Sequence, residues 1–400
     1  MEKTRRIATA VLVAIGSFRS QIAVSQSVDR SSTAAPSELG LLVGLSSERT
    51  LWISSTDGSL RLVADRPYLL VPRADGFWWA GTVTRCFAEE LNGEGMNISE
   101  VGGFVVSREE LFVTRARNTA HVVLDGEDCG TAEQEAREIN KKIARAIADS
   151  LAAAGDSTAL HAIATDTVAH EDSEEMYCEI GTRTITFVSP ELISVENRNR
   201  VTEFCSPAKY YESGENRVMP FGDTTSFDLA HLLTLRQRQR LSRGLADWLN
   251  GGELEADSNA VHGIGWAVSR DSGKWVASVF IDGPIVARGG SDMEYRPTLP
   301  RSFSGAAPLP ISWAKLKKSM PDLRDAASSP SGSHVVLLVG DTLIVAPVNS
   351  GAVGQPLIKV GVGPYQDFVM LRWASRAEVL DWNRAIPAIP APYIEVRSQP

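Results

Sequence analysis

Cysteine is scarce in this sequence: there are four among 400 residues, and no two of them have C-x-x-C spacing. Zinc ribbons and thioredoxin-like redox sites need that spacing, so both classes are disfavoured. The sequence also lacks G-x-G-x-x-G, G-x-x-x-x-G-K-[ST], H-E-x-x-H and G-x-S-x-G motifs. Nucleotide-binding folds, zincin proteases and the nucleophile elbow of α/β-hydrolases therefore have no support. No cofactor is expected.

Basic charge is also in short supply, with 40 Lys and Arg against 49 Asp and Glu and a net charge of −9. Non-specific nucleic-acid binding needs a basic surface, so no nucleic-acid partner is expected. The remaining composition is ordinary, with 43% hydrophobic and 22% charged residues. Such a chain can bury a core, which excludes a wholly disordered protein and a charge-rich coiled coil.

The first residues have the pattern of a secretory signal peptide. A basic start precedes an apolar run over 7–18, which is shorter than the roughly 20 residues of a membrane-spanning helix. Ala23 and Ser25 are small residues placed for cleavage before Gln26. The sequence predicts removal of 1–25 and a soluble periplasmic or secreted product, with no transmembrane segment after cleavage. An uncleaved anchor and a buried first helix are the alternatives.

The four cysteines all follow the expected cleavage point, in a compartment that favours disulfides over metal ligation. Four cysteines allow three connectivities. We favour Cys86–Cys129 and Cys178–Cys205, because each pair flanks one expected structural unit.

Two amphipathic helices interrupt a chain that otherwise reads as short strands. Ile139, Ile143 and Ile147 form one apolar stripe, which predicts a helix over 132–154, and a second helix is predicted over 235–249. The fold class expected is α+β, mostly antiparallel β, with a β-meander or partial propeller at each end and a helix-containing middle module. The expected units are 1–25 (signal peptide), 26–39 (flexible leader), 40–128 (N-terminal β-rich unit), 129–260 (α+β module), 261–384 (C-terminal β-rich unit) and 385–400 (a proline-rich, extended, weakly ordered tail).

The C-terminal β-rich unit contains the clearest hairpin. SPSG at 329–332 precedes HVVLLV, Gly340-Asp341 and TLIVAPV. This stretch resembles a blade of a WD40-like or TolB-like β-propeller, and LWISSTDGSLRLVA at 51–64 looks similar. Such blades often open with Ser-Pro-Asp-Gly, where this chain has Ser331 in place of the Asp. Because a ring needs at least four blades of about 40–45 residues and the helical middle cannot supply them, the resemblance implies a partial propeller.

A second resemblance lies in the middle of the chain. FVSP at 187–190, LISV at 192–195 and FDL at 227–229 are similar to an exported domain of bacterial envelope proteins. That domain accompanies lysozyme-sensing anti-sigma factors and some polysaccharide deacetylases. The family usually has a Gly-Ala-His-Pro-like turn between these points, whereas this chain has CSPA at 205–208, without the His. The resemblance implies binding rather than catalysis.

Ser312 and Lys315 match S-x-x-K, in which a lysine one helical turn from a serine takes the proton of the nucleophile. No K-T-G or S-D-N partner motif is present. Ser312 also stands where an N-cap belongs, before a short helix predicted over 313–319. The cap is the simpler interpretation, and the pair stays a catalytic candidate.

An acidic stretch over 166–175 offers the candidate metal ligands Asp166, His170, Glu171 and Asp172. Carboxylates with one imidazole suit a divalent cation, although a solvated acidic loop explains the same residues.

Trp78 and Trp79 are candidate ligand-binding residues, because adjacent aromatic rings stack on sugars where they are exposed. Burial in a sheet is the alternative.

These observations predict an exported, soluble, non-enzymatic binding or interaction protein of the bacterial cell envelope, whose partner is an envelope polymer or another protein. The alternative is an exported hydrolase with a site assembled from distant residues.

Overall fold

The computed structural model describes residues 39–56, 59–91, 102–117, 121–125, 129–154, 177–179, 182–198, 217–221, 227–250, 266–281, 293–295, 299 and 307–397. Within these ranges the chain is mostly antiparallel β-sheet with a few helices, which confirms the mostly β, α+β class. No helix in the described ranges is long and apolar enough to cross a membrane.

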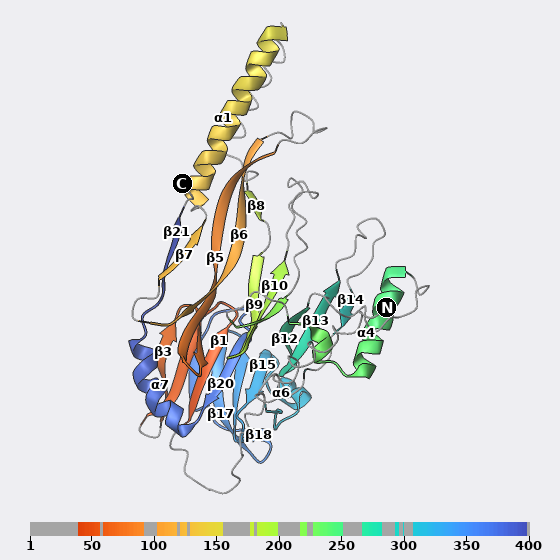
Figure 1. Ribbon diagram of the computed structural model, residues 1–400. Coiled ribbons are helices and arrows are strands. Elements are labelled where there is room, and N and C mark those ends of the chain that lie inside the picture. Colours follow the sequence, from red (N-terminus) through yellow and green to blue (C-terminus); the bar gives the residue numbers. More distant parts are fainter. Residues whose placement is uncertain are drawn as a thin grey trace, which may run out of the picture. The chain divides into compact units, whose positions relative to one another are not determined.

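The strands in the described ranges form six sheets, shown in Figure 1. The first sheet contains β20 (Phe368–Ala374), β1 (Gly40–Leu45), β2 (Thr50–Thr56) and β3 (Ser59–Arg66), and the second contains β4 (Leu69–Arg73), β5 (Gly76–Leu91), β6 (Gly102–Arg115) and β8 (Tyr177–Glu179). The third contains β9 (Thr182–Val188), β10 (Leu192–Arg198) and β11 (Arg217–Pro220), and the fourth contains β12 (Trp266–Asp271), β13 (Lys274–Ile281) and β14 (Met293–Tyr295). The fifth contains β15 (Leu323–Ser328), β16 (His334–Val339), β17 (Thr342–Asn349), β18 (Ala352–Val353) and β19 (Ile358–Gly361), and the sixth pairs β7 (His121–Asp125) with β21 (Tyr393–Arg397).

The two β-rich ends of the chain share a sheet. Strand β1 pairs antiparallel with β2 on one side and with β20 on the other, so that Leu42 lies opposite both Trp52 and Arg372. All six residues of β1 are buried. Its continuous apolar sequence, GLLVGL, is typical of a strand that is covered on both faces. The middle of the chain is therefore inserted between strands of one sheet.

Alternate residues of β1 face two different cores. Leu41 and Val43 belong to a buried cluster that includes β16 and β17, for example through Val336. Leu42 belongs to another cluster, with Trp52 beside it and residues of the second and third sheets around it. The period of two in a strand accounts for this division.

The C-terminal segment differs from the expected extended tail. Helix α7 (Arg376–Ala388) follows β20 and begins with a capping box in which Ser375 and Glu378 exchange side chain and backbone hydrogen bonds. Trp382 from α7 packs edge-to-face on Trp52 at 5.3 Å. Strand β21 then pairs in parallel with β7. Burial of this apolar helix face fixes the segment despite its prolines.

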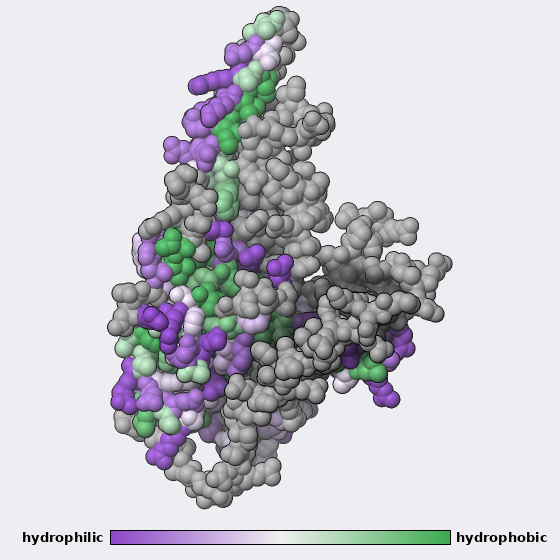
Figure 2. Space-filling model, in the orientation of Figure 1, coloured by the Kyte–Doolittle hydropathy of each residue, from purple (hydrophilic) through white to green (hydrophobic). Residues whose placement is uncertain are grey.

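A long hairpin carries the first helix. Strands β5 and β6 pair along almost their whole length, and α1 (Cys129–Ala154) packs on both of them. Strand β8 joins β6 in parallel, so this sheet crosses the expected unit boundary at residue 128. Figure 2 shows apolar residues on one flank of α1 and hydrophilic residues on the opposite flank. The helix begins three residues before its predicted start at residue 132.

The other two predicted helices are present. Helix α4 (Leu235–Asn250) starts after Thr234, whose hydroxyl accepts a hydrogen bond from the backbone N–H of Gln237 while the Gln237 side chain bonds back. Helix α6 (Trp313–Ser319) has the predicted bounds. The hairpin of β16 and β17 is confirmed as well.

Candidate functional site

Two loops from opposite ends of the chain are tied together where β1 and β20 meet. The β1–β2 turn covers residues 46–49 and the β19–β20 loop covers residues 362–367. The Ser46 N–H donates to the Asp367 carbonyl at 2.9 Å, and the Asp367 N–H donates to Ser46 Oγ at 3.0 Å. The Ser47 N–H donates to the side-chain oxygen of Gln366 at 3.0 Å. Three hydrogen bonds therefore hold the β19–β20 loop in one position.

Tyr365 is held in an unfavourable backbone conformation inside that loop. Its φ is 58°, and it follows Pro364 in a Gly-Pro-Tyr-Gln sequence, at the place where a type II turn has its positive-φ residue. The third residue of such a turn is usually glycine, because a side chain in the left-handed region costs roughly 1–2 kcal/mol. The tyrosine is 83% exposed, so burial of its ring does not offset this cost. Strained residues of this kind concentrate at functional sites.

Arg324 and Asp367 stand beside this ring. The Arg324 guanidinium lies 5.5 Å from the centre of the Tyr365 ring, and one of its nitrogens is 3.4 Å from the Asp367 carboxylate. The Asp367 side chain is 55% exposed. Partial burial raises its pKa, and the positive charge of Arg324 opposes that rise. We call Arg324, Tyr365 and Asp367 the Tyr365 platform; it presents an aromatic face, a donor and an acceptor together.

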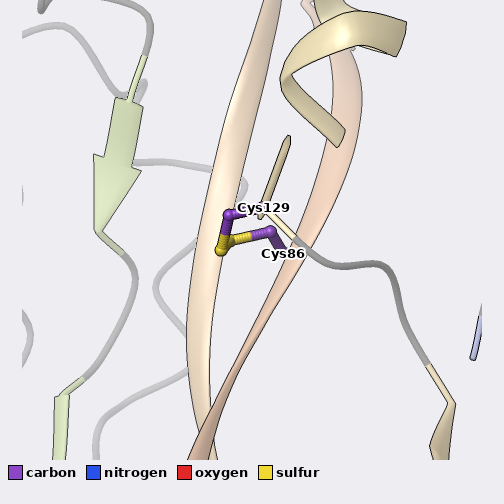
Figure 3. The surroundings of a disulfide bond; sticks show 2 residues. All are labelled: Cys86 and Cys129. Carbon is purple, nitrogen blue, oxygen red and sulfur yellow. A yellow bond between two sulfur atoms is a disulfide. The ribbon is translucent and has the colours of Figure 1, made fainter. Parts of the chain in front are cut away.

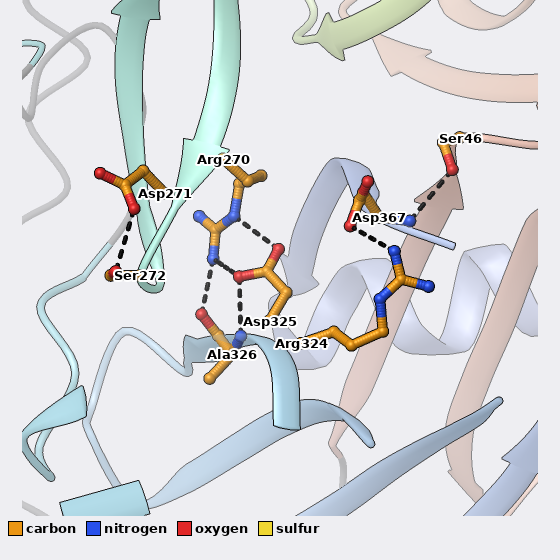
Figure 4. A network of polar contacts seen from close by, with 8 residues as sticks. All are labelled: Ser46, Arg270, Asp271, Ser272, Arg324, Asp325, Ala326 and Asp367. Carbon is orange, nitrogen blue, oxygen red and sulfur yellow. Dashed lines mark hydrogen bonds and ion pairs between the residues drawn. The ribbon is translucent and has the colours of Figure 1, made fainter. Parts of the chain in front are cut away.

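A buried ion pair lies next to the platform. Arg270 on β12 binds the Asp325 carboxylate with two nitrogens, each at 2.8 Å, and also donates to the Ala326 carbonyl (Figure 4). The side chains of Arg270 and Asp325 are 5% and 4% exposed. The guanidinium also lies 4.6 Å from the centre of the Trp275 ring. This pair joins the β12–β13 hairpin to β15 and fixes the backbone from which Arg324 extends.

The ion pair is not fully satisfied. Within the described residues the Nη1 atom of Arg270 is buried without a hydrogen-bond partner. A buried donor without a partner is not compensated for the hydration it has lost. The stability of the folded protein therefore depends more strongly on the remaining contacts of Arg270 to Asp325.

Glu48, in the β1–β2 turn, has a largely buried side chain that contacts Thr82 on β5. Its carboxylate accepts hydrogen bonds from the Thr82 N–H at 2.8 Å and from the Thr82 hydroxyl at 2.7 Å. Burial raises the pKa of Glu48, while the bonds from Thr82 lower it. Glu48 also has a positive φ of 59°. These contacts anchor the turn to β5 and so hold one side of the loop pair.

The serine and lysine of the S-x-x-K motif have separate partners. The Ser312 side chain accepts a hydrogen bond from the Lys315 backbone N–H and caps α6, so the predicted N-cap is confirmed. The Lys315 Nζ donates to the Gly351 carbonyl at 2.7 Å. The two side chains are therefore placed by the helix cap and by the β17–β18 turn.

The adjacent tryptophans face different environments. Trp79 is fully buried, whereas Trp78 is half-buried and its indole N–H donates to Asp75 at 3.0 Å. The Arg73 guanidinium lies 5.4 Å from the centre of the Trp78 ring. Trp79 thus contributes to the core, and Trp78 is a half-exposed ring with an arginine against it.

One of the two expected disulfides falls within the described residues. Cys86 on β5 is bonded to Cys129 at the start of α1, with an S–S distance of 2.00 Å (Figure 3). This bond fastens the helix to the long hairpin. Cys178 lies in β8, and Cys205 is outside the described residues, so their expected pairing stays a prediction.

The candidate metal ligands Asp166, His170, Glu171 and Asp172 also lie outside the described residues. In the part of the chain that the structure describes, no group of three or more His, Cys, Asp or Glu side chains could hold a metal ion.

Sequence reasoning missed the platform, since Arg324 is 43 positions from Asp367 in the chain. One local signal was available: Gly-Pro-Tyr-Gln places a tyrosine where a type II turn needs positive φ. A second long-range cluster was missed as well. His121 on β7 is 2.8 Å from the Glu395 carboxylate on β21, and its ring is 5.2 Å from that of Tyr393.

Comparisons with known proteins give no family. No family model matches the chain, and no curated protein does. A solved structure of a candidate 6-phosphogluconolactonase from Bacteroides uniformis is similar at 10% identity over 81% of this chain and 68% of that chain, with a TM-score of 0.14. A likeness this low carries no argument about fold or activity.

Proposed function

We propose that the chain is an exported protein of the bacterial cell envelope that acts by binding a polymer or another protein rather than by catalysis. The Tyr365 platform is the observation that supports binding. It presents an 83% exposed ring from a strained backbone position, on a loop that three hydrogen bonds hold in place. Binding sites gain affinity from groups that are rigid before the ligand arrives.

Export is supported by two independent features. The first is the signal-peptide pattern at residues 1–25. The second is the Cys86–Cys129 bond, since disulfides persist in the periplasm and outside the cell. Both features fit a periplasmic or secreted location.

The scaffold in this proposal is propeller-like. Four antiparallel strands form the sheet of β20, β1, β2 and β3, and four more, β15, β16, β17 and β19, pair antiparallel near the C-terminal end; β20 thus completes the sheet of the N-terminal strands. Propellers close their rings by adding a strand from one end of the chain to strands from the other. This supports the WD40-like or TolB-like interpretation of the two ends, with the α1-containing segment inserted between them.

The contacts of the first catalytic suspects do not favour the hydrolase alternative. A serine nucleophile needs its hydroxyl within hydrogen-bond reach of a base. Here the Ser312 hydroxyl accepts from a backbone N–H and the Lys315 amine donates to a backbone carbonyl.

Two measurements test the proposed function. Cell fractionation with N-terminal sequencing of the recovered protein should find it in the periplasm or medium, beginning at Gln26. Purified full-chain protein should then be retained by washed envelope polymer or by a specific envelope protein. A cytoplasmic location, or retention by neither class of partner, would contradict the proposal.

A further inference from the structure

The Tyr365 platform has features that narrow the class of ligand. Its exposed ring provides a flat apolar surface, and the neighbouring groups provide both hydrogen-bond roles. The Arg324 guanidinium can only donate, and the Asp367 carboxylate can only accept when ionised. A partner that suits this arrangement has an apolar face and an edge with both donors and acceptors.

Charge argues against an anionic ligand. Arg324 and Asp367 are 3.4 Å apart and balance each other, so the platform carries no net charge of its own. The chain as a whole has a net charge of −9, which repels polyanions. An uncharged ligand is therefore favoured over an acidic polymer.

The structure assigns the Tyr365 platform as a binding site for an uncharged saccharide, with one sugar ring stacked on Tyr365 and its hydroxyls bonded to Asp367 and Arg324. A pyranose ring has a C–H face that packs on an aromatic side chain, and its hydroxyls both donate and accept. Hydrogen bonds to charged groups are the stronger kind, so the carboxylate and guanidinium set the orientation of the sugar.

The site is already in its binding geometry. The loop is fixed to Ser46 and Ser47, and the backbone next to Arg324 is fixed by the buried Arg270–Asp325 pair. Because the 362–367 loop is held in place before binding, the ordering cost of binding at this loop is small. This inference rests on the proposed binding function and names its ligand class and its site.

The experiment uses the full chain and isothermal titration calorimetry with two neutral probes, cellotetraose and the tetramer of N-acetylglucosamine. Alginate serves as an acidic polysaccharide for comparison. The wild type should bind at least one neutral probe. Tyr365→Ala should weaken that binding by about tenfold or more, as loss of an aromatic anchor does, while Tyr365→Phe should stay within about threefold. Asp367→Asn should weaken it as well, because the charge-assisted acceptor is lost.

Tyr393→Ala is the matched control, since Tyr393 is 66% exposed on β21 and is not part of the platform. Its affinity should equal that of the wild type, and circular dichroism should be the same for all variants. Equal affinity of Tyr365→Ala and wild type would overturn the assignment of the site and leave the proposed function standing. Binding of alginate alone would overturn the assignment of an uncharged ligand and leave the proposed function standing. Binding of none of the three saccharides would overturn the saccharide assignment, whereas the proposed function is contradicted only if neither envelope polymer nor envelope protein retains the chain.

Discussion

Replacing Asp325 by Asn should destabilise the protein by about 3–5 kcal/mol, the usual loss when one partner of a buried ion pair is removed. The side chains of Arg270 and Asp325 are 5% and 4% exposed, so water cannot replace the lost partner. Asparagine has nearly the same shape, but its amide group turns one acceptor into a donor that faces the guanidinium. Arg270 already has one buried donor without a partner among the described residues. Unfolding in urea, followed by tryptophan fluorescence, measures the change.

Removing both charges gives the complementary test. The double variant Arg270→Met and Asp325→Leu should recover most of the lost stability, since apolar residues of similar volume often replace a buried ion pair without loss. The surface pair Arg384–Asp381 is the control, with side chains that are 80% and 74% exposed. Asp381→Asn should leave the urea midpoint unchanged, because solvent screens an exposed pair.

The reasoning would be refuted if Asp325→Asn and Asp381→Asn had equally small effects. That result would mean that the Arg270 guanidinium reaches water in solution. A double variant that is no more stable than Asp325→Asn would be a separate contradiction. It would mean that the stability is lost through changed side-chain packing and not through an unpaired buried charge.

Three further predictions concern other parts of the molecule. Burial raises the pKa of Glu48 above 4.5, so this carboxyl contributes stability that is present below its unfolded pKa and is lost as pH rises through its folded pKa. The stability of wild type relative to Glu48→Gln should therefore fall as the pH rises above 4.5, and a difference that stays constant with pH would contradict the burial. Replacing Cys86 and Cys129 by Ala opens a loop with a sequence separation of 43 and should cost about 4 kcal/mol in urea unfolding, whereas equal stability with and without reductant would argue against the bond. A fluorescent β-lactam should not label Ser312, and Ser312→Ala should cost about 1 kcal/mol as a lost helix cap; labelling that disappears in this variant would revive the hydrolase.

Local signals in the sequence were sufficient for several elements. The β16–β17 hairpin, the α6 cap at Ser312 and the α4 cap at Thr234 are each determined by residues within a few positions of one another. Helix α7 had an equally local signal, with Ser375 and Glu378 at capping-box spacing, but the prolines after it suggested an extended tail. Burial of Trp382 outweighs those prolines.

Long-range pairing could not be read from one sequence. The sequences of β1 and β20 each predict an apolar strand, but neither sequence predicts which strand it pairs with. The Tyr365 platform depends on the same pairing, because Ser46 and Asp367 are 321 positions apart. Of its residues only Tyr365 has a local signal, the strained turn position, while Arg324 and Asp367 look like ordinary surface charges until the sheets are assembled.

The position of β20 has a consequence for how the chain is made. Strand β1 is synthesised more than 300 residues before its second neighbour, β20. At a synthesis rate of about 5–20 residues per second, the edge of β1 that later pairs with β20 stays without its partner strand for roughly 15–65 s. An apolar strand with an open edge is a template for aggregation. In the exported protein that we propose, passage through the membrane as an unfolded chain would postpone that hazard until both β1 and β20 had crossed and could pair.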